Sequence, residues 1–507
     1  MISIDAPTQF AAALVFGVGR RDEAPRIAGV AHLVEHVVMS RVRRVGAFTN
    51  AMTTDNAIVF FAQGEQSQVC DFLGQIAQAL RGLDAVTVEE VEAQRRIIAA
   101  ELGELDEYPG RGHLLDRFGS RGLGLIDLGS PAHRSHTREM ILEFAGTWLH
   151  SQNATLTASA PLPKGFDLAL PQPTSALGDR DAGDIGQTGW AVSPGLPIGI
   201  SMVLRSHHRS SLVASVAVLG EALTQVLRTD RKMIYSVTPY VVDIDPSSRL
   251  VLFALDPPSD DILGAAVAAM DVVRSLAADG PDPELLRVVL ADWQTVVADP
   301  QAHVEALVDV AASVLRGYRD PDDMIVPDVR SLTGSDIAET IRTALPTILL
   351  TIGEVADPRA TLETLSETLG LDPVAQTEGH YARMNRTRMA RALLQRDVDL
   401  VSPKPFRGLR GHQLILDAER VTYVISGQSM VEARLDEVVL AGVNQTTGAW
   451  DLTTANGGGM GIVPRDWRGG KRVTERLTAA IPAHLRYPVA MKSTEPDEAD
   501  RVVAAAY

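Results

Sequence analysis

The chain has 507 residues, and at about 100–200 residues per domain this length predicts two to four domains. Its formal net charge of −17 argues against a nucleic-acid partner, which needs a basic surface. The single cysteine excludes an intramolecular disulfide and a cysteine-held metal. We see neither a signal peptide nor an uncharged apolar run of about 18 residues, so we expect a cytoplasmic protein with no membrane span.

The first third of the chain shows a mixed pattern of strands and helices. Strands are predicted at 10–19, 56–62 and 153–159, and helices at 29–43, at 68–83, from 87 onward and at 138–150. The helix at 29–43 is apolar on nearly every side in its first turns, which indicates burial. Residues 163–189 are rich in proline, glycine and aspartate and predict a linker.

The same pattern then recurs. Strands are predicted at 198–204, 249–255 and 347–353, and helices at 212–227, 261–277, 283–317 and 334–344. The helix–strand segments 138–159 and 334–353 look like two copies of one ending. The fold class is therefore α+β, with two homologous halves that we place at 1–165 and 190–385.

The last part of the chain has a different texture. Short strands are predicted at 412–416, 421–425, 430–434, 437–442, 449–454 and 459–463, followed by a helix at 471–481. This pattern predicts a small β-barrel or sandwich closed by a helix, at 403–485. It resembles a pleckstrin-homology-like domain in texture, and such folds bind lipids, peptides or proteins.

The most specific motif is the segment 32–36, HLVEH. His32 and His36 are one helical turn apart on one face, so both imidazoles can reach one metal ion. Glu35 lies beside them and can take a proton from an attacking water, as in the H-x-x-E-H motif. Coincidence is the alternative. However, three polar side chains on an otherwise apolar helix are unfavourable when buried, and a metal would offset that cost.

A catalytic zinc needs a third protein ligand, and the helix that begins near residue 87 offers one. Its apolar residues Ile97, Ile98, Leu102 and Leu105 define a face, and Glu101 falls within that face by the 100° helical step. We therefore expect Glu101 to be the third ligand. The alternative is a glutamate that reaches from the apolar stripe into water.

Residues 29–36, GVAHLVEH, resemble the G-x-A-H-x-x-E-H motif of the pitrilysin/insulinase family of zinc metallopeptidases, which includes the mitochondrial processing peptidase. The helix with Glu101 is similar to the one that carries the family's third ligand. Residues 50–53, NAMT, resemble its N-A-x-T strand, which lies along the peptide, and this implies that Asn50 and Ala51 contact substrate. Residues 227–237 resemble L-R-E-x-R-G-L-x-Y-S-V, which implies that Arg228 and Tyr235 also do.

The resemblance implies a clam-like arrangement of the halves, a Zn²⁺ cofactor, a peptide substrate and zinc-dependent endopeptidase activity of the kind that processes peptides. The family encloses peptides between four homologous halves, and this chain has two, so we expect a homodimer or a heterodimer with a related chain. One departure is Gln94, where the family often has a second glutamate. It favours the alternative of a non-catalytic, peptide-binding subunit that supports an active partner. A third hypothesis assigns the function to the C-terminal module.

The remaining histidines do not have ligand spacing to another histidine or glutamate on an apolar helix. We interpret them as surface or loop residues; they are His113, His133, His136, His150, His207 and His208.

Overall fold

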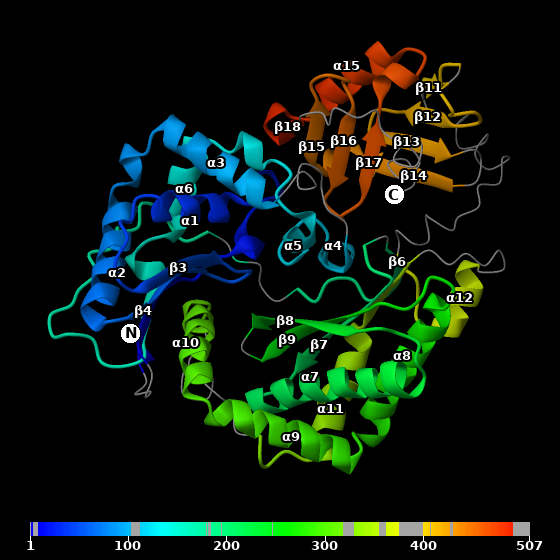
Figure 1. The fold of residues 1–507 in the computed structure, drawn as a ribbon. Coiled ribbons are helices and arrows are strands. Elements are labelled where there is room, and N and C mark those ends of the chain that lie inside the picture. The colour runs from blue at the N-terminus through cyan, green and yellow to red at the C-terminus, as the bar shows by residue number, and fades with distance from the viewer. Residues whose placement is uncertain are drawn as a thin grey trace.

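A computed structural model defines the fold at residues 2–3, 9–102, 112–178, 180, 184–193, 195–245, 247–317, 329–353, 361–374, 399–405, 407–425 and 429–489. Figure 1 shows three bodies: a blue N-terminal half, a green second half and an orange C-terminal module. Helices and strands are mixed in both halves, which confirms the predicted α+β class.

The first half is built on one five-stranded sheet in the order β1-β5-β2-β4-β3. Its strands are β1 (Ile2–Ser3), β2 (Phe10–Phe16), β3 (Phe48–Thr53), β4 (Ile58–Gly64) and β5 (Ala154–Ala158). Its helices are α1 (Val30–Met39), α2 (Gln66–Arg81), α3 (Val88–Leu102), α4 (His113–Phe118), α5 (Gly124–Leu128) and α6 (Arg138–Trp148). Alternate residues of β2, such as Leu14 and Phe16, join the buried cluster that includes α1, α2 and α6.

The second half repeats this plan with the sheet order β6-β10-β7-β9-β8. Its strands are β6 (Gly189–Val192), β7 (Ile198–Arg205), β8 (Val237–Asp245), β9 (Ser248–Leu255) and β10 (Leu349–Ile352). Its helices are α7 (Arg209–Leu223), α8 (Ile262–Asp279), α9 (Pro283–Ala298), α10 (Pro300–Leu315), α11 (Gly334–Ala344) and α12 (Leu362–Leu369). Each sheet has two edge strands with a single neighbouring strand in the described part of the chain: β1 and β3 in the first half, and β6 and β8 in the second.

Each half covers the far face of the other half's sheet. Helix α10 of the second half packs on β2 and β5, where Ala311 and Ala312 meet Ala13 and Val15. In return, α4 of the first half packs on β7, β8 and β9, with Leu114 beside Val203 and Leu250. Figure 1 shows α10 and the α4–α5 pair between the two halves. This exchange of helices fixes the halves together.

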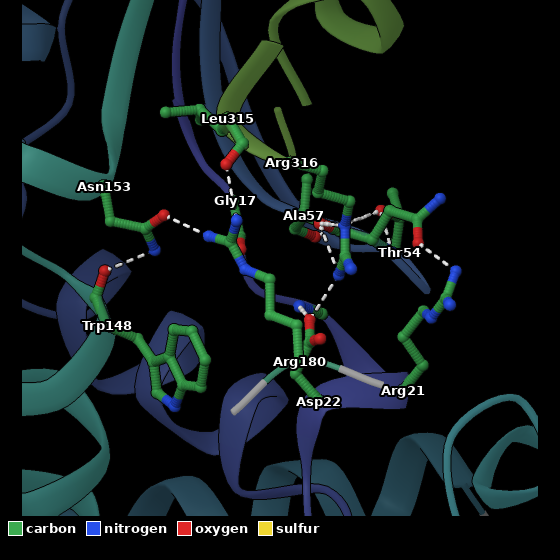
Figure 2. A network of polar contacts seen from close by, with 12 residues as sticks. Gly17, Arg21, Asp22, Thr54, Ala57, Trp148, Asn153, Arg180, Leu315 and Arg316 are labelled. Carbon is green, nitrogen blue, oxygen red and sulfur yellow. Dashed lines mark hydrogen bonds and ion pairs between the residues drawn. The ribbon is translucent and has the colours of Figure 1, made fainter. Parts of the chain in front are cut away.

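A buried polar network reinforces the junction (Figure 2). Arg316, which follows α10, forms an ion pair with Asp22 of the first half, and the two side chains are 9% and 0% exposed. Arg180, in the segment between the halves, donates to the carbonyls of Gly17 and Leu315. The Asp22 carboxylate and several backbone carbonyls thus bind the guanidinium groups of Arg316 and Arg180, which belong to different parts of the chain.

The C-terminal module consists of two four-stranded sheets that share one core with a helix. Its strands are β11 (Asp399–Val401), β12 (Gln413–Leu416), β13 (Arg420–Ile425), β14 (Ser429–Arg434), β15 (Val438–Asn444), β16 (Trp450–Thr454), β17 (Gly459–Ile462) and β18 (Arg486–Val489), and its helix is α15 (Gly470–Ala480). Leu414, Leu452 and Leu477 come from the two sheets and α15 and belong to one buried cluster. The module is thus a sandwich closed by a helix. It contacts the first half, where the Ser120 hydroxyl donates to the Thr454 carbonyl.

The structure corrects several element boundaries. The first helix ends at Met39, because its backbone leaves the helix at Ser40–Arg41. The sequence patterns missed the strands β1, β6, β8, β11 and β18. The segment Arg209–Asp230 is long and apolar enough to cross a membrane by length and composition, but 50% of it is buried, and it packs against α8, α9 and α11. We therefore assign it to the core of the second half.

Candidate metal centre

The start of α1 is set by Gly29 and Glu23. Gly29 has φ +91, in the left-handed region, and a Cβ there would lie 2.4 Å from the Ser130 hydroxyl oxygen. The buried Glu23 carboxyl accepts the amides of Gly29 and Ala31, each at 2.7 Å. Burial raises the pKa of Glu23 to about 8. These contacts fix the first turn of α1, and hence the direction in which His32 points.

His32, His36 and Glu101 meet at one point between α1 and α3. The Nε2 atoms of the two histidines are 3.1 Å apart, and Glu101 Oε2 lies 3.8 Å from His32 Nε2 and 3.4 Å from His36 Nε2. A tetrahedral zinc with ligands at about 2.0–2.1 Å would separate neighbouring ligand atoms by about 3.3 Å. The three ligand atoms therefore fit a zinc ion, and no other cluster of this kind occurs among the described residues.

The state of His32 also suits a metal. Burial, helped by His36 and Arg20, lowers the pKa of His32 to about 4, so its ring is neutral near pH 7 and retains a lone pair. Glu101 differs from its predicted setting: its side chain is 50% exposed, and Ile97 and Leu102 beside it are exposed as well. The sequence pattern predicted that Glu101 is a carboxylate within an apolar face of the helix. The prediction of an apolar setting is wrong, although Glu101 lies beside both histidines as expected.

Glu35 lies on α1 next to the cluster and is 7% exposed. Its carboxylate accepts a hydrogen bond of 2.8 Å from the Thr53 hydroxyl, at the end of β3. Burial raises the pKa of Glu35, while the hydrogen bond from Thr53 opposes that shift. A carboxylate with a raised pKa is a better proton acceptor, as a general base requires.

Strand β3 carries Asn50 and Ala51. It pairs with β4 alone among the described strands, so its outer edge has backbone donors and acceptors for a further strand. The Asn50 side chain is exposed, Ala51 is half-buried, and Thr53 of the same strand holds Glu35. The same strand therefore has an unpaired outer edge and, at its end, a contact with the Glu35 carboxylate.

Arg228 and Tyr235 form a pair of their own in the second half. The Arg228 guanidinium carbon lies 5.5 Å from the centre of the Tyr235 ring, and Tyr235 is 76% exposed. The helix ends before Tyr235, at Asp230, so the two residues do not share a helix. The start of this helix lies near the first half, because Arg209 pairs with Asp243, whose backbone carbonyl accepts a hydrogen bond from Arg21. Arg228 lies roughly 25–30 Å further along the helix. The structure does not bring this pair to the metal cluster of its own chain.

Four histidines that we expected on the surface or in loops are buried. His113, His133, His136 and His150 are 1–4% exposed, whereas His207 and His208 are exposed as predicted. His113 is held between the Thr351 and Ser201 hydroxyls at 2.7 and 2.6 Å. Ligand spacing could not reveal the role of His113, because its hydrogen-bond partners lie far away in the sequence.

Sequence reasoning also missed two residues that position the site. Glu23 caps α1 from a loop six residues before Gly29, and no helical spacing indicates this contact. Thr53 belongs to the NAMT segment that we singled out, but nothing in that segment indicated a bond to Glu35. The signal for Thr53 was its place at the inward-facing end of an otherwise exposed strand.

Comparison with known proteins gives two sequence matches. Residues 1–131 match the model of the insulinase family, peptidase family M16. An uncharacterized zinc protease from Mycobacterium leprae is 25% identical over 313 residues, which cover 52% of this chain and 68% of the relative.

Solved structures share the fold at low sequence identity. A chain of complex III2 from Candida albicans has a TM-score of 0.54 at 14% identity and covers 72% of this chain and 96% of its own length. An inactive M16 peptidase domain from Pseudomonas fluorescens scores 0.53 at 14%, covering 70% and 96%. The first half of the periplasmic protease PqqL from Escherichia coli scores 0.52 at 15%, covering 73% and 92%. The first 131 residues of the chain thus match the insulinase family of peptidases, M16, which is the family that the motif predicted.

Proposed function

We propose that this protein is a zinc-dependent endopeptidase that hydrolyses extended peptides. The observation that carries the proposal is the cluster of His32, His36 and Glu101, whose ligand atoms are spaced for one tetrahedral zinc, with Glu35 beside it. A bound zinc would supply a Lewis acid that polarises the scissile carbonyl and makes water a stronger nucleophile.

Residues of the chain would carry out the proton transfer and hold the ligands and the substrate. The Glu35 carboxylate takes a proton from the attacking water and then gives it to the nitrogen of the leaving amine. Thr53 holds that carboxylate in place. His32, His36 and Glu101 keep their donor atoms converged, and Glu23 maintains the start of the helix that presents them. The peptide would lie along the outer edge of β3, beside Asn50 and Ala51, as an added strand.

We also propose that a second chain completes the site. Arg228 and Tyr235 are exposed and lie at the end of α7 away from the contact with their own first half. A partner, either a second copy or a related chain, would bring its own Arg228–Tyr235 pair to a peptide on β3. Light scattering at micromolar concentration should show at least a dimer. A strict monomer that cleaves peptides at full rate would contradict this part.

Two measurements on the purified protein test the central proposal. Metal analysis by mass spectrometry should find about one zinc per chain. Cleavage of a peptide library should require that zinc and return when it is restored after chelation. Zinc at this stoichiometry without hydrolysis would support the alternative, a non-catalytic peptide-binding subunit. Gln94 favours that alternative, and an inactive M16 domain is among the structural neighbours. Protein without bound zinc would overturn both the cofactor and the activity.

A further inference from the structure

A second site lies beside α1 and is lined in part by His32. A cavity of about 10 Å³ lies between α1, the middle of α3 and the turn η5 (His133–Ser135). The residues that line it are Gly29, His32, Leu33, Arg95, Ile98, Ser130, His133 and His136. This volume holds one atom-sized guest and is too small for an amino-acid side chain or a hydrated metal ion.

His136 is the feature that requires an explanation. It is 1% exposed, it lines the cavity, and neither of its ring nitrogens has a hydrogen-bond partner among the described residues. A buried polar group without a partner is destabilising, and native structures rarely leave one so. A guest that accepts a hydrogen bond from the His136 ring would remove that penalty.

The charges around the cavity decide which kind of guest fits. Arg95 lines it, and its buried Nε is also without a partner in the described part of the chain. Arg26 acts on His136 electrostatically, and two nitrogens of its own guanidinium are buried and unpaired. The neighbouring acids are engaged elsewhere: Glu92 pairs with an Nη of Arg95, and Glu23 accepts the α1 amides. The surroundings are thus positive and repel a cation.

We infer that this cavity is a binding site for a monatomic anion, with chloride as the natural guest, coordinated by Arg95 Nε, the His136 ring and the Ser130 hydroxyl. All three groups can donate a hydrogen bond, and an anion accepts from several donors at once. The guest would also offset the charge of the Arg26 guanidinium, two of whose nitrogens are buried without a partner among the described residues. Because the anion would lie between α1, α3 and η5, it would stabilise the position of the helix that carries His32 and His36.

The test uses metal-free protein, so its outcome does not depend on the peptidase proposal. Melting temperature is compared in sodium chloride and sodium gluconate at equal ionic strength. We expect chloride to raise it saturably, by roughly 2 °C or more, because a ligand of the native state stabilises by mass action. In His136→Leu the difference should vanish, while His412→Leu, in the C-terminal module, should retain it. Equal stability in the two salts, or an unchanged chloride effect in His136→Leu, would overturn the inference.

A second measurement does not depend on the folding of any variant. Crystals of the unaltered chain, grown in gluconate and soaked in bromide, should show an anomalous peak in the cavity within hydrogen-bond distance of His136 and Arg95. An ordered water in the same place without anomalous signal would overturn the anion assignment. Ser130→Ala should weaken the chloride effect without abolishing it, because two of the three donors remain.

Discussion

The two halves of this molecule have one fold and two different surfaces. Their sheets have the same strand order, and the first long helix of each half packs against the third, α1 on α3 and α7 on α9. On α1 the half-buried positions include His32 and His36, whereas α7 has serine, alanine, valine and leucine at its buried positions. Among the residues that the structure describes, the common scaffold therefore carries a candidate metal cluster in only one of its two halves, and the difference lies in a few side chains.

The second difference between the two halves is the position at which their first helix ends. Helix α1 is ten residues long and stops at Met39, whereas α7 continues through η7 (Thr224–Asp230), beyond which Tyr235 is exposed. The second half thus projects a cationic and aromatic pair outward, where the first half gathers ligands inward. We interpret the first half as the one that reacts and the second as the one that holds substrate for a partner.

The strongest test of this contrast is Glu35→Gln. Because general base catalysis contributes typically about 10²–10⁴-fold, we expect peptide hydrolysis to fall by at least that order while bound zinc stays unchanged. The matched control is Glu221→Gln on α7, an exposed glutamate of the corresponding helix, which should leave the rate unaltered. Loss of zinc in Glu35→Gln would mean that Glu35 is a ligand and that its assigned role is wrong.

The junction between the halves can be broken at Arg316. Replacing it with leucine leaves the fully buried Asp22 carboxylate without its ion-pair partner, and breaking such a pair costs about 3–5 kcal/mol of unfolding free energy. Arg287→Leu is the control, since its pair with Glu284 is exposed and should add little to the free energy of unfolding. Urea unfolding followed by fluorescence measures both. Equal effects would show that the Asp22 contact does not hold the halves together.

The third test separates the ligand from its neighbours on the same helix. Glu101→Gln keeps the shape of the side chain and removes its charge, so we expect zinc affinity to fall by more than about 100-fold, the upper range for loss of an outer-shell partner. Glu89→Gln, in the first turn of α3, should bind zinc as the parent does. Competition with a chelating dye gives both affinities. Unchanged affinity in Glu101→Gln would remove this residue from the ligand set.

Much of the scaffold could be predicted from sequence because local patterns encode it. The apolar runs at 10–19 and 198–204 and the helix–strand endings at 138–159 and 334–353 all appear as elements close to those positions. Strand β8 escaped because its exposed and buried residues do not alternate cleanly, so it lacks the period of a half-buried strand. Helix α4 is only six residues long, too short for a periodic pattern.

The candidate site shows the same division between local and distant information. His32, Glu35 and His36 are close in sequence, and a single helix places them. Glu101 was found from its helical face, although the face proved more open than expected. Glu23 and Thr53 act through contacts that only the tertiary fold creates. The long-range environment, which makes His113 a buried residue, is likewise absent from any local pattern.

The smallest expected effect concerns His113, a histidine that lies outside the metal cluster. His113 is fully buried between the halves, and burial, with Arg117 nearby, lowers its pKa to about 3 from an ordinary value of 6.5. The unfolded chain therefore binds a proton between about pH 6.5 and 3 that the folded chain does not, so stability falls as the pH drops through this window. At pH 5 the loss from this residue is about 2 kcal/mol relative to pH 7. In His113→Gln, which can still hydrogen-bond to Ser201 or Thr351, the fall between pH 7 and pH 5 should be smaller by that amount. Exposed His207→Gln should change nothing. Urea unfolding of the metal-free protein measures the slopes, and identical slopes for the His113 variant and the parent would show that this imidazole takes up its proton without unfolding.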